Sequence, residues 1–515
     1  MIWNIVKKEF YNNLLTANFI IGFILCLLLI PFTVYTGAKT YENRVSQYQK
    51  DLKRAAEVFE KTQVYGQLQP LCIQPVTPLS IFCKGITEQI GNNVQIRIDE
   101  KSTFAEDITT MHENPFLNSF MSLDFVNILC IILSLLGMFF SYNLFSNEKE
   151  KGTLKLFFSN SVSRSIFFTG KITGIYITII PVLFICYIIV LLIIQFSPLV
   201  KLSENDYLRI CVMFIFSIVY FSFFVCLGGY ISSKTSSSAR SLIINLFVWC
   251  FILFLLPNII SYAGKNFVKI PDYNAIKVNM SEIDQEFWER YNELQKKVKK
   301  EDLKSTGWNM CAGWIFGPLQ LCFTPRPTMQ YERRLHELTA PTVLDYADKK
   351  WPLQESYLKD LYHQQRIIKY LSCLSPSEIF KHITASVCKT DMNAHIDFME
   401  KTRIYRDQFF QYYKDKKIFS SFKYFSAQDE NTFPENWEQA DEMYNTWRIK
   451  ANPESTFDLT SFGYLDTSDI PKFNYKSQNI INGLANQVIL LGVILFLCII
   501  LLWVTYISFL NYDVR

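Results

Sequence analysis

The sequence has 515 residues, of which 50% are hydrophobic and 19% are charged, and its formal net charge is only +4. A soluble chain of this length would form about three domains, but here the apolar residues gather in long runs. The short charged runs are expected to be solvated helix faces. Nothing in the sequence indicates nucleic-acid binding, so no nucleic-acid partner is expected.

The N-terminal arm, residues 1–16, predicts an amphipathic helix at a membrane surface. Lys7 and Lys8 lie away from its apolar stripe, which carries Trp3, Val6, Phe10 and Leu14. The alternative is that the arm simply extends the first membrane span.

Six apolar runs are long enough to cross a bilayer, which needs about 20 residues per helix. The first is too long for the apolar core of a signal peptide, so we expect it to be retained. The fold class predicted is mainly α: a polytopic membrane protein with six transmembrane helices plus a mostly helical extracytoplasmic domain. The runs cover residues 17–37, 125–145, 172–196, 210–232, 242–263 and 485–510.

Two polar insertions, residues 38–124 and 264–483, are predicted to build the extracytoplasmic domain. The first opens with a stretch free of glycine and proline, which predicts a helix. In "LQPLCIQPVTPLSIFCKGI" the prolines disfavour regular structure, whereas "NNVQIRIDE" alternates like a short strand.

The second insertion is predicted to be chiefly helical, with Ser281 as the cap of one helix. Residues 308–323 are apolar but too short to span, so we expect them to pack in this insertion or dip into the interface. An aromatic stripe at helical spacing is expected in the core; it comprises Phe398, Thr402, Tyr405, Phe409 and Tyr412.

Lysine and arginine are concentrated in the short segments 1–16, 147–171 and 234–240, whereas the short loop 197–206 holds only Lys201. By the positive-inside rule these three segments and both chain termini are cytoplasmic. Both insertions then face outward, and the chain is expected in the cytoplasmic (inner) membrane of a bacterium.

Six of the 13 cysteines fall in the insertions and none falls in a cytoplasmic segment. An even number in an oxidising compartment predicts disulfides. Pairing of nearest neighbours would join Cys72 to Cys83, Cys311 to Cys322 and Cys373 to Cys388, although other connectivities stay open.

The predicted spans contain no ionisable residue between their boundaries, since Asp124 and Arg209 stand at the edges. Intramembrane charges mark proton relays and ion paths, so a proton-coupled carrier and an intramembrane protease are excluded. The nearest match to a phosphate-binding loop, "FFTGKIT", lacks the first glycine and has Ile172 in place of Ser or Thr. We therefore expect no catalytic residue and no cofactor in this chain.

A cluster of potential metal ligands falls in the second insertion: Cys373, His382, Cys388 and His395. Thiolate and imidazole would suit a soft metal, but the spacing matches no standard zinc pattern. We expect no metal, and instead a disulfide with surface histidines.

The connector "NEKEKGTLKLFFSNSVSRSIFFTGK", residues 147–171, admits two interpretations. It is either a basic loop that only fixes topology or a short helix that docks on a cytoplasmic motor. For docking, Glu148 and Glu150 with Lys149, Lys151 and Lys155 would be exposed ion-pairing groups that specify a partner. Gly152 would allow a turn, and the apolar face would come from Leu154, Leu156, Phe157 and Phe158.

The connector resembles the E-x-E-x-G-T-L…S-x-P-V-S-R…x-G-K signature of the membrane subunits of ABC type-2 exporters. The matching residues are Glu148, Glu150, Gly152, Thr153, Leu154, Ser159, Val162, Ser163, Arg164, Gly170 and Lys171, with Ser161 in place of the frequent proline. The resemblance implies that the connector couples to an ATPase. The "VKKEF" stretch, with Lys7 and Lys8, resembles the N-terminal interface helix of the same family.

Two stretches of the insertions resemble a subgroup of these permeases with an enlarged outward domain. They are "QPVTPLSIFCKGI" and "LSPSEIFKHITASVCKTDMNAHIDFMEKTRIYRDQF". The resemblance therefore covers nearly the whole chain.

The resemblance implies a non-catalytic permease subunit that couples ATP hydrolysis by two copies of a cytoplasmic ABC ATPase to the export or extraction of a substrate. A second permease, identical or paralogous, and the lipid bilayer would be its other partners. One alternative is a machine that relays ATP hydrolysis to an envelope partner. Another is a membrane-anchored receptor or enzyme with its site in the second insertion.

Overall fold

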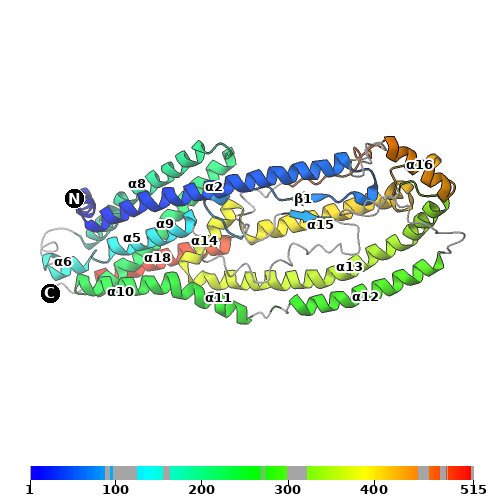
Figure 1. Cartoon of the computed structure of the whole chain (residues 1–515). Coiled ribbons are helices and arrows are strands. Elements are labelled where there is room, and N and C mark those ends of the chain that lie inside the picture. The colour runs from blue at the N-terminus through cyan, green and yellow to red at the C-terminus, as the bar shows by residue number, and fades with distance from the viewer. Residues whose placement is uncertain are drawn as a thin grey trace.

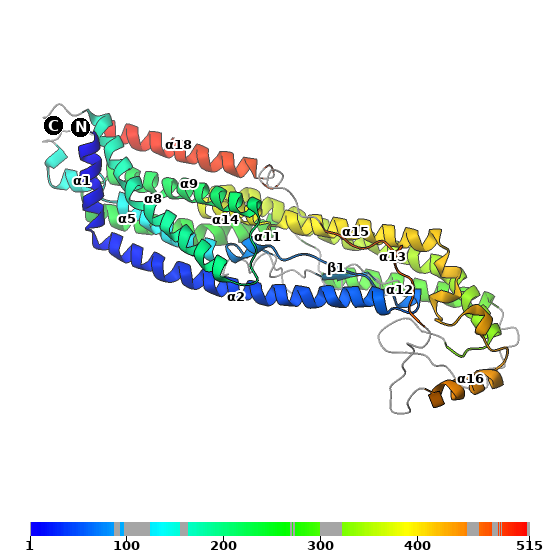
Figure 2. The same ribbon diagram turned by 90° about the horizontal axis from the view of Figure 1, so that it is seen from above.

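The computed structural model shows an elongated, almost entirely helical molecule (Figure 1). Helix α1 and the last turn of α18 lie at the same end of it, called the terminal end below (Figures 1 and 2). The structure describes residues 2–86, 93–96, 124–154, 163–267, 270, 273–298, 322–450, 463–475, 483, 485 and 487–511.

Six helical segments in the described part of the chain are long and apolar enough to cross a membrane, which confirms the predicted spans. The fifth is interrupted by a π-helical turn, η4 (Phe251–Leu255). The segments are α2 (Ala17–Lys61), α5 (Phe125–Ser141) with α6 (Ser146–Glu150), α8 (Arg164–Phe196), α9 (Glu204–Lys234), α10 (Ser238–Cys250) with α11 (Leu256–Phe267), and α18 (Val488–Leu510).

The first span does not end where its apolar run ends. Helix α2 has 45 residues and continues into the first insertion without a break. At 1.5 Å per residue it is about 68 Å long, roughly twice the thickness of a hydrocarbon core. The predicted boundary at residue 37 therefore falls inside one rigid helix.

Helix α1 (Ile2–Leu14) lies across the bundle rather than extending α2 (Figure 2). The predicted helix is confirmed, and its predicted apolar stripe is only partly buried: Val6 is buried, Phe10 and Leu14 are half-buried and Trp3 is exposed. Ile5 and Val6 are buried, whereas Trp3 is 65% exposed. The close packing of α1 on α8 depends on Gly170, where an added Cβ would meet the Ile5 side chain at 2.9 Å.

The insertions contribute the rest of the fold. The predicted strand is present: β2 pairs antiparallel with β1, placing Cys72 opposite Val94. Ser281 lies inside α12, so the helix start predicted there is wrong. The elements are η1 (Tyr65–Gln67), β1 (Leu71–Ile73), η2 (Pro78–Ile81), β2 (Asn93–Gln95), α12 (Tyr273–Lys297), α13 (Arg326–Leu371), η5 (Ser372–Leu374), α14 (Pro376–Cys388), α15 (Met392–Asp415), η6 (Ile418–Ser420), η7 (Phe422–Tyr424), η8 (Glu430–Thr432) and α16 (Trp437–Lys450).

The aromatic stripe of α15 forms the core of the insertions at the end of the molecule away from α1. Phe398, Thr402, Tyr405 and Phe409 are buried, as predicted, and Tyr412 is half-buried. They pack with residues of η6, η7 and the segment 463–475. This hydrophobic cluster is separate from the one that the membrane spans form.

Helix α14 of the second insertion is buried in the core of the membrane bundle. Phe380 stacks on Tyr220 of α9 with ring centroids 4.8 Å apart. The Tyr220 hydroxyl donates to the carbonyl of Cys130 in α5 at 3.1 Å. The bundle and the second insertion therefore share one hydrophobic core.

A turn of the first insertion closes over the end of α14. The Ile86 N–H donates to the Thr390 carbonyl at 3.0 Å. Gly85 has a φ of +55°, and a Cβ there would lie 2.2 Å from the Thr390 carbonyl oxygen. The contact thus requires glycine at this position.

The cysteines do not show the nearest-neighbour disulfides. Cys72, Cys83, Cys373 and Cys388 carry free thiols, and Cys311, the expected partner of Cys322, lies outside the described residues. The Cys388 thiol lies beside the backbone of Cys83, and burial raises the pKa of both thiols.

The structure also describes the surroundings of the potential metal ligands. Among the described residues, no group of three or more His, Cys, Asp or Glu side chains could hold a metal ion. His395 is buried rather than at the surface, and burial lowers its pKa from 6.5 to about 4.

The first prediction concerns the shared core. Phe380→Ala removes a fully buried ring from between α14 and α9, so we expect it to lower the free energy of unfolding by about 3–5 kcal/mol. Ile404→Ala, at a side chain 56% exposed on α15, should change it by less than about 0.5 kcal/mol. Melting of the protein in nanodiscs measures both; equal melting temperatures for the two variants would contradict the shared core.

The second prediction follows from His395. Between pH 6.5 and 4 the unfolded chain binds a proton on this residue and the folded chain does not. The free energy of unfolding should therefore fall by about 1.4 kcal/mol for each unit of acidification in that window. His395→Gln should flatten this part of the pH profile of the melting temperature, and His363→Gln, at an exposed histidine of α13, should leave it as in the wild type.

Candidate functional site

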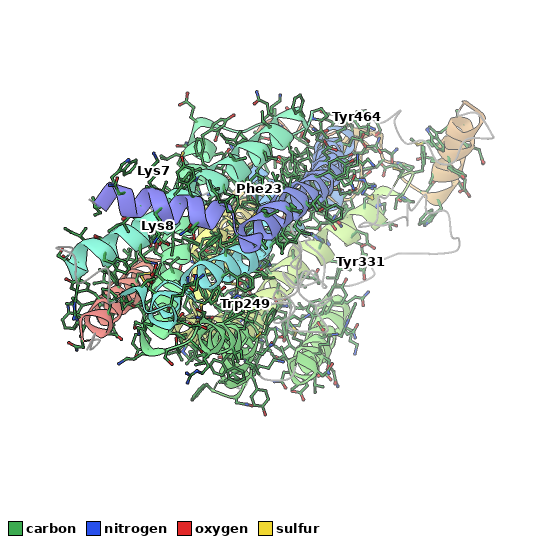
Figure 3. All side chains as sticks on the ribbon, turned by 90° about the vertical axis from the view of Figure 1, so that its left-hand side faces the viewer. Lys7, Lys8, Phe23, Trp249, Tyr331 and Tyr464 are labelled. Carbon is green, nitrogen blue, oxygen red and sulfur yellow. The ribbon has the colours of Figure 1, made fainter. Side chains whose placement is uncertain are left out.

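The described part of the connector lies at the terminal end, beside α1. Figure 3, which views the molecule from that end, shows Lys7 and Lys8 on α1 where it crosses the bundle. Residues 155–162 lie outside the described residues. The roles predicted for Lys155, Leu156, Phe157, Phe158, Ser159 and Val162 therefore concern a part that is not described.

Helix α6 is held on the end of α9. The Ser232 hydroxyl accepts the N–H groups of both Phe145 and Ser146 at 3.0 Å, which satisfies free donors at the start of α6. Lys149 donates to the carbonyls of Ser233 and Thr235 at the last turn of α9. A cation at this position is favourable because the carbonyl end of a helix carries partial negative charge.

A buried cluster of three charges joins α6 to two other helices. Nζ of Lys171, on α8, lies 3.0 Å from Oε1 of Glu9 on α1 and 3.2 Å from Oε1 of Glu148 on α6. All three residues are buried. The second oxygen of Glu148 accepts the Thr153 hydroxyl. We call Glu9, Glu148 and Lys171 the charge cluster.

The expectation that Glu148 is an exposed group for a partner is wrong. Its carboxylate points inward because Lys171 supplies the opposite charge from α8. Glu150, the last residue of α6, and Lys151, which follows it, are exposed. Even Glu150 has an internal role, since it accepts the N–H of Ser238 at the start of α10 at 2.9 Å.

The chain turns directly after α6. Gly152 has a φ of +67°, a conformation that favours glycine, and this agrees with its predicted role as a turn. Thr153 follows and bonds to Glu148. Leu154 is buried in the bundle core, so the turn directs the chain back onto the bundle.

The second half of the motif begins α8. The Ser163 hydroxyl accepts the Ile166 N–H at 3.3 Å and so caps the helix. Arg164 donates to the carbonyl of Leu510 at the last turn of α18. Ser163 therefore caps the start of α8, and Arg164 connects this start to the end of α18.

Two residues that the sequence analysis did not single out complete the site. Glu9 follows Ile5 and Val6 on the buried face of α1, and an acidic residue at that spacing is the signal that could have identified it. Ser232 gave no such signal, because its contacts come from a segment about 90 positions away in the chain.

The third prediction tests the charge cluster. Lys171→Met leaves two buried carboxylates without their cation, so we expect a loss of about 3–5 kcal/mol in the free energy of unfolding. The triple change Lys171→Met with Glu9→Gln and Glu148→Gln should recover most of this loss, because no charge is then left unpaired. Melting in nanodiscs measures the difference; Lys7→Met, at an exposed lysine of α1, is the control, and a single change as harmless as that control would contradict the cluster.

Comparison with known proteins assigns the chain to a family. Residues 3–514 match the family model described as "ABC-2 family transporter protein". No curated protein matches the sequence. Six apolar helical segments in the described part of the chain fit a multi-pass membrane protein. Because the family match covers nearly the whole chain, the chain belongs to the ABC-2 transporter family and is a membrane permease component of an ABC transporter.

Proposed function

We propose that this permease is the membrane-spanning subunit of an ABC type-2 exporter, which moves or extracts a substrate with energy from a separate ATPase subunit. Membership of the family implies association with an ABC ATPase and with the membrane. On this proposal the permease has no catalytic step of its own and acts as a lever.

The charge cluster is the observation that carries the proposal. Through Lys171, helices α1 and α6 are both fixed to α8 at the terminal end. A buried ion pair resists separation because either charge alone is costly in a low-dielectric site. A push on α6 would thus be delivered to the start of a 33-residue span and to the helix that crosses the bundle.

The exposed charges next to the cluster are the proposed dock. Lys151, Glu150, Lys7 and Lys8 are exposed at the terminal end, whereas Glu148 and Lys171 transmit the force from within. The positive-inside rule places this end in the cytoplasm and both insertions outside. We propose a bacterial inner membrane, two ATPase copies and a second permease, identical or paralogous.

The fourth prediction tests docking and coupling separately. Lys151→Glu combined with Lys7→Glu reverses two exposed charges, so we expect the ATPase that co-purifies with the permease to bind about tenfold more weakly. Glu9→Gln leaves that surface intact but weakens the charge cluster. It should preserve ATPase binding and lower the permease-dependent rate of ATP hydrolysis in nanodiscs.

The matched control is Lys359→Glu, at an exposed lysine of α13 far from the terminal end. Binding and hydrolysis rates should equal those of the wild type. If the double reversal also behaves like the wild type, the dock is elsewhere and the connector serves only topology.

The relay of motion to an envelope partner stays a second candidate because of α2. Its far end is bound to the second insertion: the Leu465 N–H donates to the Thr62 carbonyl at 2.9 Å and the Thr467 hydroxyl to the Phe59 carbonyl at 3.0 Å. In the same nanodisc samples, a relay requires that hydrogen exchange at residues 58–67 changes when the ATPase is trapped with ATP. Unchanged exchange there would exclude the relay and leave export.

A further inference from the structure

A cavity of about 330 Å³ lies where the membrane spans meet the second insertion. Its walls come from α11, α13, α14 and α15 and from the starts of α5 and α18, which converge in the middle of the molecule (Figure 1). Since α5 and α18 begin their apolar runs at Phe125 and Val488, the cavity sits at one boundary of the predicted membrane. Its volume is within the range of small-molecule sites.

Polar side chains without a partner converge on this cavity. The hydroxyls of Ser261 and Tyr362, the amide nitrogen of Gln365 and the amide oxygen of Gln487 are buried and have no hydrogen-bond partner in the described structure. Ser261 is 8% exposed and Gln487 is 2% exposed. Buried polar groups are normally paired, so four in one cavity indicate a ligand that pairs them.

The acidic side chains of the lining already have partners. Glu378 pairs with Lys381 at 3.1 Å. Asp124 accepts the N–H groups of Lys84 and Asn127 at 3.1 and 2.8 Å. Asp391 accepts the side-chain amide of Asn393 at 2.9 Å. With Arg366 and Lys369, the lining has three acidic and three basic residues, so it favours no net charge on a ligand.

The remaining wall is apolar and opens at the surface. Val126, Ile368, Met392 and Ile396 line it, and the lining residue Tyr370 is 50% exposed. One side of a bound molecule would thus meet hydrocarbon, and the other would meet donors and acceptors that carry no charge.

We propose that this cavity binds a neutral amphiphile, with a hydroxyl-rich head on the side chains of Ser261, Tyr362, Gln365 and Gln487 and a hydrocarbon chain on the apolar wall. A hydroxyl both donates and accepts, so such a head pairs the amide nitrogen, the amide oxygen and the two hydroxyls alike. The proposal goes beyond the coupling function and does not require an ATPase.

Binding of radiolabelled octyl glucoside to the whole permease in phosphatidylcholine nanodiscs tests the site without ATPase or ATP. We expect saturable binding above that of empty nanodiscs. Octyl phosphate, which has the same chain and an anionic head, should compete at least tenfold less well. Competition by a monoglucosyl diacylglycerol placed in the bilayer would identify the membrane as the source, and its absence would identify a soluble amphiphile.

Two substitutions locate the binding. Ser261→Ala and Gln487→Leu each remove one group without a partner, so each should weaken octyl glucoside binding roughly three- to tenfold. Ser372→Ala is the control, because its buried hydroxyl bonds to the Ile368 carbonyl at 2.8 Å and does not line the cavity. Melting temperatures verify that all three variants are folded.

The site is overturned if binding does not saturate, if octyl phosphate competes equally well, or if the two lining variants bind like Ser372→Ala. Octyl glucoside should raise the melting temperature of the wild type and of Ser372→Ala. Loss of this rise in Gln487→Leu would support the site. Failure of these binding tests would not count against the coupling proposal. They use no ATPase, and they change neither the exposed docking charges nor the charge cluster.

Discussion

The arrangement at the terminal end depends on one buried cation shared by two carboxylates. Lys171 is flanked by Glu9 and Glu148, and the three come from helices that are separate in the sequence. Burying each charge costs free energy that only the others offset. The pairing therefore fixes the position of α1 and α6 relative to α8, in addition to the close packing of α1 on α8 at Gly170. The charges of the cluster face inward, whereas Lys7 and Lys151 are exposed.

The second organising feature is that the two insertions pack into the core of the membrane bundle. Phe380 of α14 stacks within the bundle, and the turn at Gly85 closes on Thr390. The two stretches that resemble an enlarged-domain subgroup are thus the ones that make this seal. The sequence divides into membrane spans and insertions, but one hydrophobic core contains residues of both. The cavity with free polar groups lies along the same seam, where polar and apolar walls necessarily meet.

Sequence periodicity predicted the elements whose signal is local. The six spans, the strand at residues 93–95 and the buried stripe of α15 depend on apolar spacing within single segments, and all are present. The inward direction of Glu148 was not predictable, because it depends on Lys171, a partner brought close only by the fold. The start of α12 was misplaced at Ser281, since a good capping residue also occurs inside helices. Membership of the family was predictable from the connector, and the joining of that connector to α1 was not.

The position of α14 also has a consequence for biosynthesis. A ribosome completes α5 and α9 long before it reaches Phe380, yet Tyr220 and Cys130 are buried by that later helix. Until α14 is made, the surfaces of α5 and α9 that Ser377 and Phe380 contact lack this packing partner. The shared core can therefore be completed only after the second insertion has been made. A chain that ends before residue 376 would lack α14 and its contribution to the shared core.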